Sequence, residues 1–340
     1  MQLNLPIFEQ LDRCQNILIA SMGGGFDIFC GLPILFALQD RGQRLHLANL
    51  TFSPAHLIDG PTRLTPSLVG VTADTVPFPS AALTAALQNP AIAAAARQAG
   101  LGGYFPEYYL ARWFRAERGA DVTIWCFDKT GVRPLLENYR RLINHLGIDG
   151  ILLIDGGVDS LIRGDEAEVG TFIEDSVSLA AVSALDHVPV RLLGCLGLGA
   201  EQDIAYAHVF ENIAALAGSA AFLGSCALTR QMPAYQAYEA AVLSVQDVPF
   251  QDPSVINSSI VSAVQGNFGD YHLTAKTHGS TLWISPLMAL YWFFDLPPVA
   301  AHNPMLEQVS ATETFREAMR AMMLARQNVR QRSPKRIPLP

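Results

Sequence analysis

The chain has 340 residues and a formal net charge of −8; half of its residues are hydrophobic and only 16% are charged. The negative charge argues against non-specific nucleic-acid binding, which needs clustered Lys and Arg side chains to neutralise phosphates. The five cysteines form no close pair in the sequence, so we expect reduced thiols and a cytoplasmic location. A mean hydropathy of +0.23 indicates strands that are buried on both faces.

The sequence offers no segment that we expect to enter a membrane. The first ten residues contain Glu9 and no basic run, which argues against a secretory signal peptide. The most apolar segment, Leu282–Phe294, contains Pro286 and is much shorter than the ~20 residues that span a bilayer. We interpret it as a buried strand end and helix, or as a subunit contact.

The first elements in chain order predict a strand–helix–strand unit. Asn16–Ser21 is typical of a buried strand, a glycine turn follows, and Ile28–Gln39 has helical spacing before a second strand at Leu45–Phe52. Residues 77–119 differ, because an alanine-rich stretch is followed by the aromatic segment Tyr104–Phe114. We interpret 77–119 as an inserted helical cap whose aromatic segment closes over the site as a lid.

Short apolar runs then alternate with helical stretches to the end of the chain. The predicted strands are Val122–Phe127, Gly150–Ile154, Val190–Leu193 and Ala220–Ser225, with an edge-strand region around Tyr271–Ile284. The predicted helices are Pro134–Leu146, Glu174–Leu185, Glu201–Leu216, Ala234–Val245 and Thr312–Val329; Ser254–Val264 is a further element. The pattern predicts a Rossmann-like α/β fold, with a doubly wound, mostly parallel sheet of six or seven strands and the inserted cap. We expect one domain over residues 1–330 and a disordered basic tail over 331–340.

Ligands of such sheets bind at the carboxyl ends of the strands, and the first candidate loop follows the first strand. Gly23, Gly24 and Gly25 allow the backbone to approach a ligand closely, and Asp27 follows them. The loop matches neither the dinucleotide nor the P-loop fingerprint. Asp27 therefore either caps the helix or binds a hydroxyl, amino or guanidino group of a substrate.

The second candidate loop follows the strand Gly150–Ile154 and contains four carboxylates within twelve residues. These charges repel one another, so an arginine, a divalent cation, a cationic ligand or partial protonation must compensate. Mg²⁺ and Mn²⁺, the candidate cofactors of this loop, prefer carboxylate oxygens. The alternative is a solvated turn with helix-capping acids. The expected site residues are Asp155, Gly156, Gly157, Asp159, Ser160, Arg163, Asp165 and Glu166, with Asp155 and Asp159 as the candidate metal ligands.

A third candidate region supplies groups that transfer protons. Asn267 and Asp270 lie in an irregular glycine-containing segment, and His272 and His278 follow. A histidine in a loop is, however, more often a hydrogen-bonded structural residue. Glu201, which follows another glycine-containing strand end, is a weaker candidate acid.

The two glycine–acid loops together resemble a known family. The strand and Gly-Gly-Gly-x-Asp turn beginning at Asn16, the segment Ile154–Ser160 and the segment Arg163–Glu166 resemble the domain of unknown function 1152 family. The resemblance covers about residues 14 to 300. It implies one intact α/β domain in which the two loops are paired, and it supplies no reaction.

We therefore expect an enzyme that acts on a small polar metabolite by hydrolysis or group transfer. Its expected catalytic residues are Asp155, Asp159, Asp270 and His278, and its expected substrate-binding residues include Asn267 and the two loops. Two alternatives remain open: a nucleotide- or dinucleotide-binding protein (redox enzyme or sensor), and a non-catalytic assembly subunit. Under each hypothesis we expect a homo-oligomer.

Overall fold

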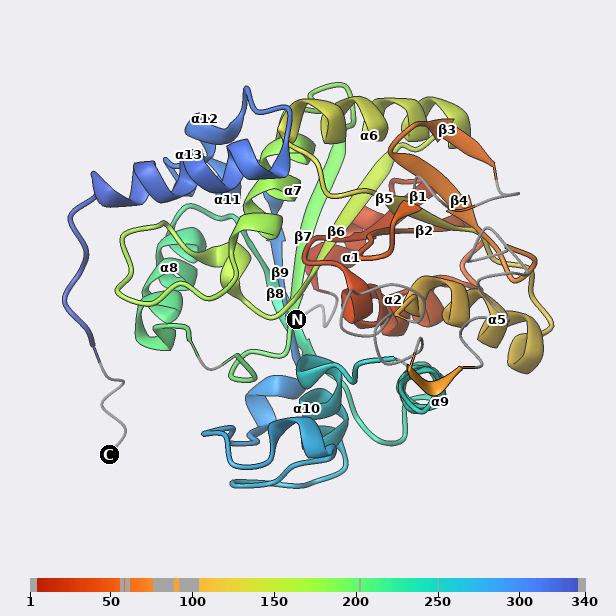
Figure 1. The fold of residues 1–340 in the computed structure, drawn as a ribbon. Helices are drawn as coiled ribbons and strands as arrows, with labels where there is room; N and C mark the ends of the chain where they lie inside the picture. Colours follow the sequence, from red (N-terminus) through yellow and green to blue (C-terminus); the bar gives the residue numbers. More distant parts are fainter. Residues whose placement is uncertain are drawn as a thin grey trace.

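The computed structural model describes residues 5–55, 58, 62–75, 89–91, 104–201, 203–249 and 251–335. Within these residues the protein is an α/β protein built on one nine-stranded mixed sheet (Figure 1). Along the sheet, the order is β3 (Arg63–Thr65), β4 (Leu68–Val71), β5 (Ile124–Phe127), β2 (Arg44–Leu50), β1 (Asn16–Ser21), β6 (Gly150–Gly156), β7 (Val190–Leu196), β9 (Leu290–Asp295) and β8 (Phe222–Ala227).

The centre of the sheet is parallel and its margins are antiparallel. Strands β5, β2, β1, β6 and β7 pair in parallel, whereas β3, β4, β8 and β9 join the sheet through antiparallel pairs. The chain moves outward from β1 to β2 and β5, and then returns to the other side of β1 to form β6 and β7. Ser21 pairs with Ile154, so the loops that follow β1 and β6 begin side by side. The strand order therefore reverses at this place, where open α/β sheets bind ligands.

Both faces of the sheet are covered, because the side chains of each central strand alternate between two hydrophobic clusters. In β1, Leu18 and Ala20 belong to one cluster, and Ile17 and Ile19 to the other. The first cluster includes residues of α6, α7, α8 and α13, and the second includes residues of α2, α5, α9 and α10 (Figure 1). The helices of the described residues are α1 (Pro6–Leu11), α2 (Leu32–Leu38), α5 (Pro106–Arg118), α6 (Val132–Leu146), α7 (Ile173–Ser183), α8 (Tyr206–Gly218), α9 (Pro233–Gln246), α10 (Val255–Val264), α11 (Leu296–His302), α12 (Leu306–Val309) and α13 (Phe315–Gln327).

The region just before β9 has a different structure from the one expected, whereas the buried strand expected within Leu282–Phe294 is present as β9. The edge-strand prediction around Tyr271–Ile284 is wrong, since this region contains the short 3-10 helix η4 (Ala275–Thr277) and one isolated bridge between Gly269 and Ile284. The strand lies further on, in β9, which is inserted between β7 and β8. Tyr291, Phe293 and Phe294 of β9 are fully buried. Burial in the sheet therefore accounts for the apolar character of this run.

More than half of the range expected to form a cap, residues 77–88 and 92–103, lies outside the described residues. The aromatic segment expected to act as a lid is described and forms α5. Its side chains Leu110, Trp113 and Phe114 are buried against the sheet in the second hydrophobic cluster. The helix α5 is therefore part of the core. In the described residues, no helix has the length and apolar character needed to cross a membrane.

Candidate functional site

A pocket of about 480 Å³ lies at the carboxyl ends of β1, β6 and β7. The position of the pocket follows from the topology of the sheet. The chain leaves β1 toward one face of the sheet and leaves β6 toward the other face. A crevice therefore opens between the two loops. Its walls come from the turn after β1, the loop after β6, the first turn of α7, the loop after β7 and the start of α10. The lining residues are Gly23, Gly24, Asp27, Phe52, Asp155, Gly156, Asp159, Thr171, Glu174, Asp175, Ala200, Glu201, Asp203, Val255 and Ile256.

The lining is strongly acidic. Seven of the residues just named carry a carboxylate, and among the described residues that line the pocket none is Lys, Arg or His. A positive group at the edge of the pocket is Lys129, whose Nζ atom lies 2.6 Å from Glu174 Oε1 and 4.3 Å from the centroid of the Phe52 ring. The pocket therefore suits a cationic ligand and disfavours a bare anion.

The glycines of both loops provide space for carboxylates. A Cβ atom at Gly156 would lie 2.8 Å from Asp27 Oδ1, and one at Gly23 would overlap the same carboxyl group. A Cβ atom at Gly157, where φ is +146°, would lie 2.5 Å from Glu201 Oε2. The glycines thus allow Asp27 and Glu201 to lie against the backbone. Asp27 does not act as an N-cap, because it lies within the 3-10 helix η1 (Gly25–Gly31), which precedes α2.

Hydrogen bonds fix the loop that follows β6. Asp155 accepts a hydrogen bond from the backbone N–H of Ser160 at 3.1 Å and a second from the Ser160 hydroxyl. Glu201 Oε2 accepts from the backbone N–H of Val158 at 2.9 Å, which joins the loop after β7 to the loop after β6. Two of the carboxylates are therefore held in place by the backbone before any ligand binds.

Three carboxylates are close enough to share one cation. Asp155, Asp159 and Asp175 each offer an oxygen, and these oxygens all lie within 4.8 Å of one another. All three residues are buried, at 1%, 3% and 4% exposure, and Asp175 Oδ1 has no hydrogen-bond partner among the residues that the structure describes. An unpaired, buried carboxylate oxygen that lines a pocket is free to bind a ligand.

Burial raises the pKa of every carboxyl group in this cluster. It raises the pKa of Asp155 to about 6, against the lowering effect of the Ser160 hydrogen bonds. The pKa values of Asp159 and Asp175 are raised well above the ordinary value, first by burial and then by neighbouring carboxylates. Asp27 and Glu201 are shifted in the same direction, also by burial and then by the charge of Asp155. The cluster therefore resists full ionisation unless positive charge enters it.

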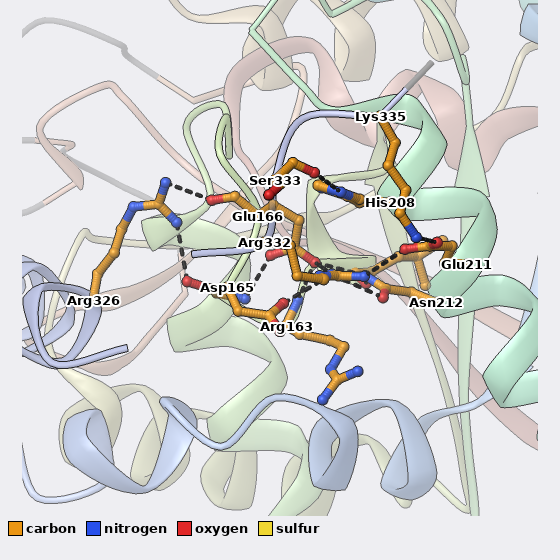
Figure 2. Close-up of polar contacts among 12 residues, drawn as sticks. Arg163, Asp165, Glu166, His208, Glu211, Asn212, Arg326, Arg332, Ser333 and Lys335 are labelled. Carbon is orange, nitrogen blue, oxygen red and sulfur yellow. Dashed lines mark hydrogen bonds and ion pairs between the residues drawn. The ribbon is translucent and has the colours of Figure 1, made fainter. Parts of the chain in front are cut away.

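The structure brings the two predicted loops together but divides the second one. Asp155, Gly156 and Asp159 line the pocket with Gly23, Gly24 and Asp27, and Ser160 binds Asp155. Arg163, Asp165 and Glu166 do not line it. Figure 2 shows that this part of the loop binds the C-terminal segment, where Arg332 contacts Asp165 at 2.8 Å and Glu166 at 2.6 Å. Residues 331–335 of the expected disordered tail therefore lie against the protein, whereas 336–340 lie outside the described residues.

The third predicted region is also separate from the pocket. Asn267, Asp270 and His278 lie in the connection between α10 and β9 and are not among the lining residues. His272 Nε2 lies 2.9 Å from Asp270 Oδ1, its Nδ1 lies 2.8 Å from Thr277 Oγ1, and its ring packs edge-on against His278. These groups bind one another and form a local structural network.

Sequence reasoning left several pocket residues unassigned. Glu174 and Asp175 fall at the start of the predicted helix Glu174–Leu185, where acids are common, and the structure places them in the first turn of α7. Thr171, Asp203 and Phe52 have no local motif, because they reach the pocket only through the fold. The strand-end rule was the available signal, and it had pointed to Glu201 as a weaker candidate.

Outside the pocket lining, a further buried carboxyl group lies beside the glycine turn. Glu107 of α5 is fully buried, and Asn49 Nδ2 donates to Glu107 Oε1 at 2.7 Å and to the carbonyl of Gly25 at 2.8 Å. Asn49 Oδ1 in turn accepts from the Ser21 hydroxyl. Burial raises the pKa of Glu107 to about 7. This network supports the turn that carries Asp27.

Comparison with known proteins assigns the family and no activity. No curated protein and no solved structure matches the chain. The model of the family described as protein of unknown function (DUF1152) matches residues 77–327, which is more than half of the chain. The matched residues include Asp155, Asp159 and Asp175, whereas Asp27 precedes them. The chain therefore belongs to the DUF1152 family.

Proposed function

We propose that the acidic pocket binds a divalent cation, Mg²⁺ or Mn²⁺, and that the protein is an enzyme that acts on a small polar metabolite by hydrolysis or group transfer. The observation that carries this proposal is the convergence of Asp155, Asp159 and Asp175 within 4.8 Å, with one Asp175 oxygen left without a partner. Three buried carboxylates at such distances repel one another, and a hard divalent cation with oxygen ligands compensates them.

The remaining pocket residues have roles that fit this chemistry. A bound divalent cation would polarise an oxygen of the substrate. Asp27 lines the same pocket without belonging to the three candidate ligands, and burial raises its pKa, which suits a group that accepts and returns a proton. Phe52, Val255 and Ile256 form an apolar wall for the less polar part of the substrate. The five parallel strands act, in this proposal, as a doubly wound unit with its switch point between β1 and β6.

Mn²⁺ binding followed by electron paramagnetic resonance tests the proposal. The wild-type protein, first treated with a chelator, should bind Mn²⁺ until about one ion is bound per chain. The signal of free Mn²⁺ should fall accordingly. An Asp159→Asn/Asp175→Asn variant should bind more than about 100-fold more weakly, because two ligands are lost. Asp186→Asn, at a side chain that is 92% exposed, is the matched control and should bind as wild type does. Equal binding by wild type and the double variant would exclude this site.

A nucleotide-binding function is the second candidate, and the strand order favours it. The order β5-β2-β1-β6-β7 and a glycine turn after β1 are typical of dinucleotide-binding sheets. Asp27 on that turn and the acidic lining disfavour a phosphate unless a cation accompanies it. Thermal-shift measurements with NAD(P), ATP and S-adenosylmethionine, each with and without Mn²⁺, separate the two cases. Stabilisation by one of them without Mn²⁺ would favour the nucleotide function.

A further inference from the structure

One loop connects two of the three candidate cation ligands. Asp159 begins the 3-10 helix η3 (Asp159–Leu161), and Asp175 lies in the first turn of α7. The residues between them, 162–172, form no helix or strand of their own beyond an isolated bridge from Val169 to Ile204. The distance between the two carboxylates therefore depends on how this loop is held.

Glu166 is the centre of that loop. Its carboxylate accepts hydrogen bonds from the backbone N–H groups of Arg163 at 2.9 Å and Gly164 at 2.7 Å. Asn212 Nδ2 of α8 donates to the same carboxylate at 2.7 Å. Glu166 is fully buried, so its negative charge needs a positive partner.

The C-terminal segment supplies that partner. We call residues 326–335 the C-terminal strap. Arg332 binds Glu166 at 2.6 Å, Asp165 at 2.8 Å and Glu211 at 3.0 Å. Arg326 donates to the carbonyls of Gly164, Glu166 and Ala167 at 3.0, 2.7 and 3.0 Å. Figure 2 shows both arginines reaching the acidic loop, with Lys335 bound to Glu211.

A short chain of hydrogen bonds continues from the strap to the pocket. Arg332 also donates to Asn212 Oδ1 at 3.2 Å, and Asn212 Nδ2 donates to the carbonyl of Leu161 at 2.9 Å. Leu161 is the last residue of η3, the helical turn that begins with Asp159. Arg332 thus reaches the turn that carries Asp159 through one intervening side chain.

We propose that Arg332 is a positioning residue for the cation site, and that the C-terminal strap holds Asp159 and Asp175 at the separation that a divalent cation requires. This inference rests on the proposed function of the pocket. Without Arg332, Glu166 keeps its neutral donors but loses the charge that faces it, and local opening of the loop becomes easier. Cation affinity then falls, although every ligand remains.

The test compares Arg332→Ala with Arg330→Ala in the full-length chain. Arg330 is an exposed residue of the same segment and makes none of these contacts, so the two variants lose the same charge. We expect Arg332→Ala to weaken Mn²⁺ binding about 10-fold, within the range for residues that orient metal ligands. Hydrogen exchange should also become about 10-fold faster at the amides of residues 159–161 and in the first turn of α7. Arg332→Lys keeps one charge and should lie between wild type and Arg332→Ala.

Each outcome decides the matter. Weaker Mn²⁺ binding with faster exchange in Arg332→Ala, and wild-type behaviour of Arg330→Ala, supports the proposal. Faster exchange with unchanged Mn²⁺ affinity overturns it, because the strap would then only stabilise the fold; unchanged exchange overturns it as well. If wild type binds no Mn²⁺, the proposed function fails and exchange alone decides. Faster exchange that reaches Asp159 then supports positioning by the strap, and faster exchange confined to residues 163–167 contradicts it.

Discussion

The Asp27 carboxylate lies directly against the backbone of Gly156, so that a Cβ atom at Gly156 would be 2.8 Å from Asp27 Oδ1. Gly156 ends β6, and Asp27 belongs to the turn after β1. The missing side chain at one strand end therefore makes room for the acid of the neighbouring strand end. This relationship explains why both loops carry glycine beside an acid.

Gly156→Ala should destabilise the protein and weaken cation binding. Gly156 does not have a positive φ, so alanine can adopt its backbone conformation. The change in stability should therefore come from the steric clash with Asp27. We expect a loss of about 1–3 kcal/mol in the free energy of unfolding, typical of overpacking. Urea denaturation measures this loss, and Mn²⁺ titration measures the affinity.

Gly218→Ala is the matched control. A Cβ atom at Gly218, the last residue of α8, meets nothing within 4 Å, so its stability should be unchanged or slightly increased. The Gly156→Ala/Asp27→Ala double variant should lose less stability than the sum of the single variants, because the clashing group is gone. Wild-type stability of Gly156→Ala would contradict the steric explanation.

The sequence was sufficient to locate the central strands and the paired loops, because buried strands leave uninterrupted apolar runs. Asn16–Ser21 was predicted with its observed bounds, and the structure brings Asp27 and Asp155 into one pocket. Asp175 could not be assigned in the same way. Acids are common at helix starts, and only the tertiary structure turns this one toward the strand ends.

The remaining differences have physical causes that are not local. Asp165 and Glu166 belong to the same acidic run as Asp155, yet they bind the C-terminal strap, about 160 residues further along the chain. The aromatic strand β9 is hydrophobic on both faces, and its run therefore shows no alternation that would separate a strand from a helix. In both cases the structure depends on contacts between residues that are far apart in the sequence.

Asp175→Asn should stabilise the protein when no cation is bound. The pKa of Asp175 is raised in the folded state, so a protonated Asp175 favours the folded protein. This stabilisation is complete below about pH 4 and is lost as the pH rises through the folded-state pKa. Asparagine stays neutral, and the variant should therefore be more stable than wild type at pH 8 in the presence of a chelator. The gain should shrink at pH 4. Thermal unfolding at both pH values measures the difference.

The same variant should lose the stabilisation that Mn²⁺ gives to wild type, because one ligand is missing. Asp186→Asn is the control, since its exposed carboxyl group lies outside the pocket. It should show neither the gain without a cation nor the loss of the response to Mn²⁺. If Asp175→Asn were less stable than wild type at pH 8 in chelator, the carboxylates would not be repelling one another.

Lys129→Met should strengthen cation binding. Lys129 neutralises Glu174 at the pocket, and its removal makes the local potential more negative while methionine preserves much of the packing against Phe52. We expect Mn²⁺ affinity to rise about twofold to fivefold at low salt, and the gain to fall as salt screens the charges. Arg133→Met, at an exposed ion pair with Glu313, is the control and should leave the affinity unchanged. A weaker affinity in Lys129→Met would place the cation elsewhere.

Glu107→Gln should remove a pH dependence of stability that is independent of the cation. The pKa of Glu107 is raised by burial from 4.5 to about 7, so its contribution to stability is fully present below pH 4.5 and is lost as the pH rises through about 7. Glutamine keeps the oxygen that accepts from Asn49 and carries no charge. Above pH 7 the variant should therefore be more stable than wild type, by an amount on the order of 3 kcal/mol at full ionisation.

Urea denaturation between pH 5 and pH 9, in the presence of a chelator, measures the difference between Glu107→Gln and wild type. The difference in stability should be small near pH 5, grow as the pH rises toward 7, and stay constant above that pH. Glu117→Gln changes an exposed residue of the same helix and should follow the wild-type curve throughout. Parallel curves for Glu107→Gln and wild type would mean that Glu107 is already ionised at pH 5. The network through Asn49 and Ser21 would then have to stabilise a buried charge beside the turn that carries Asp27.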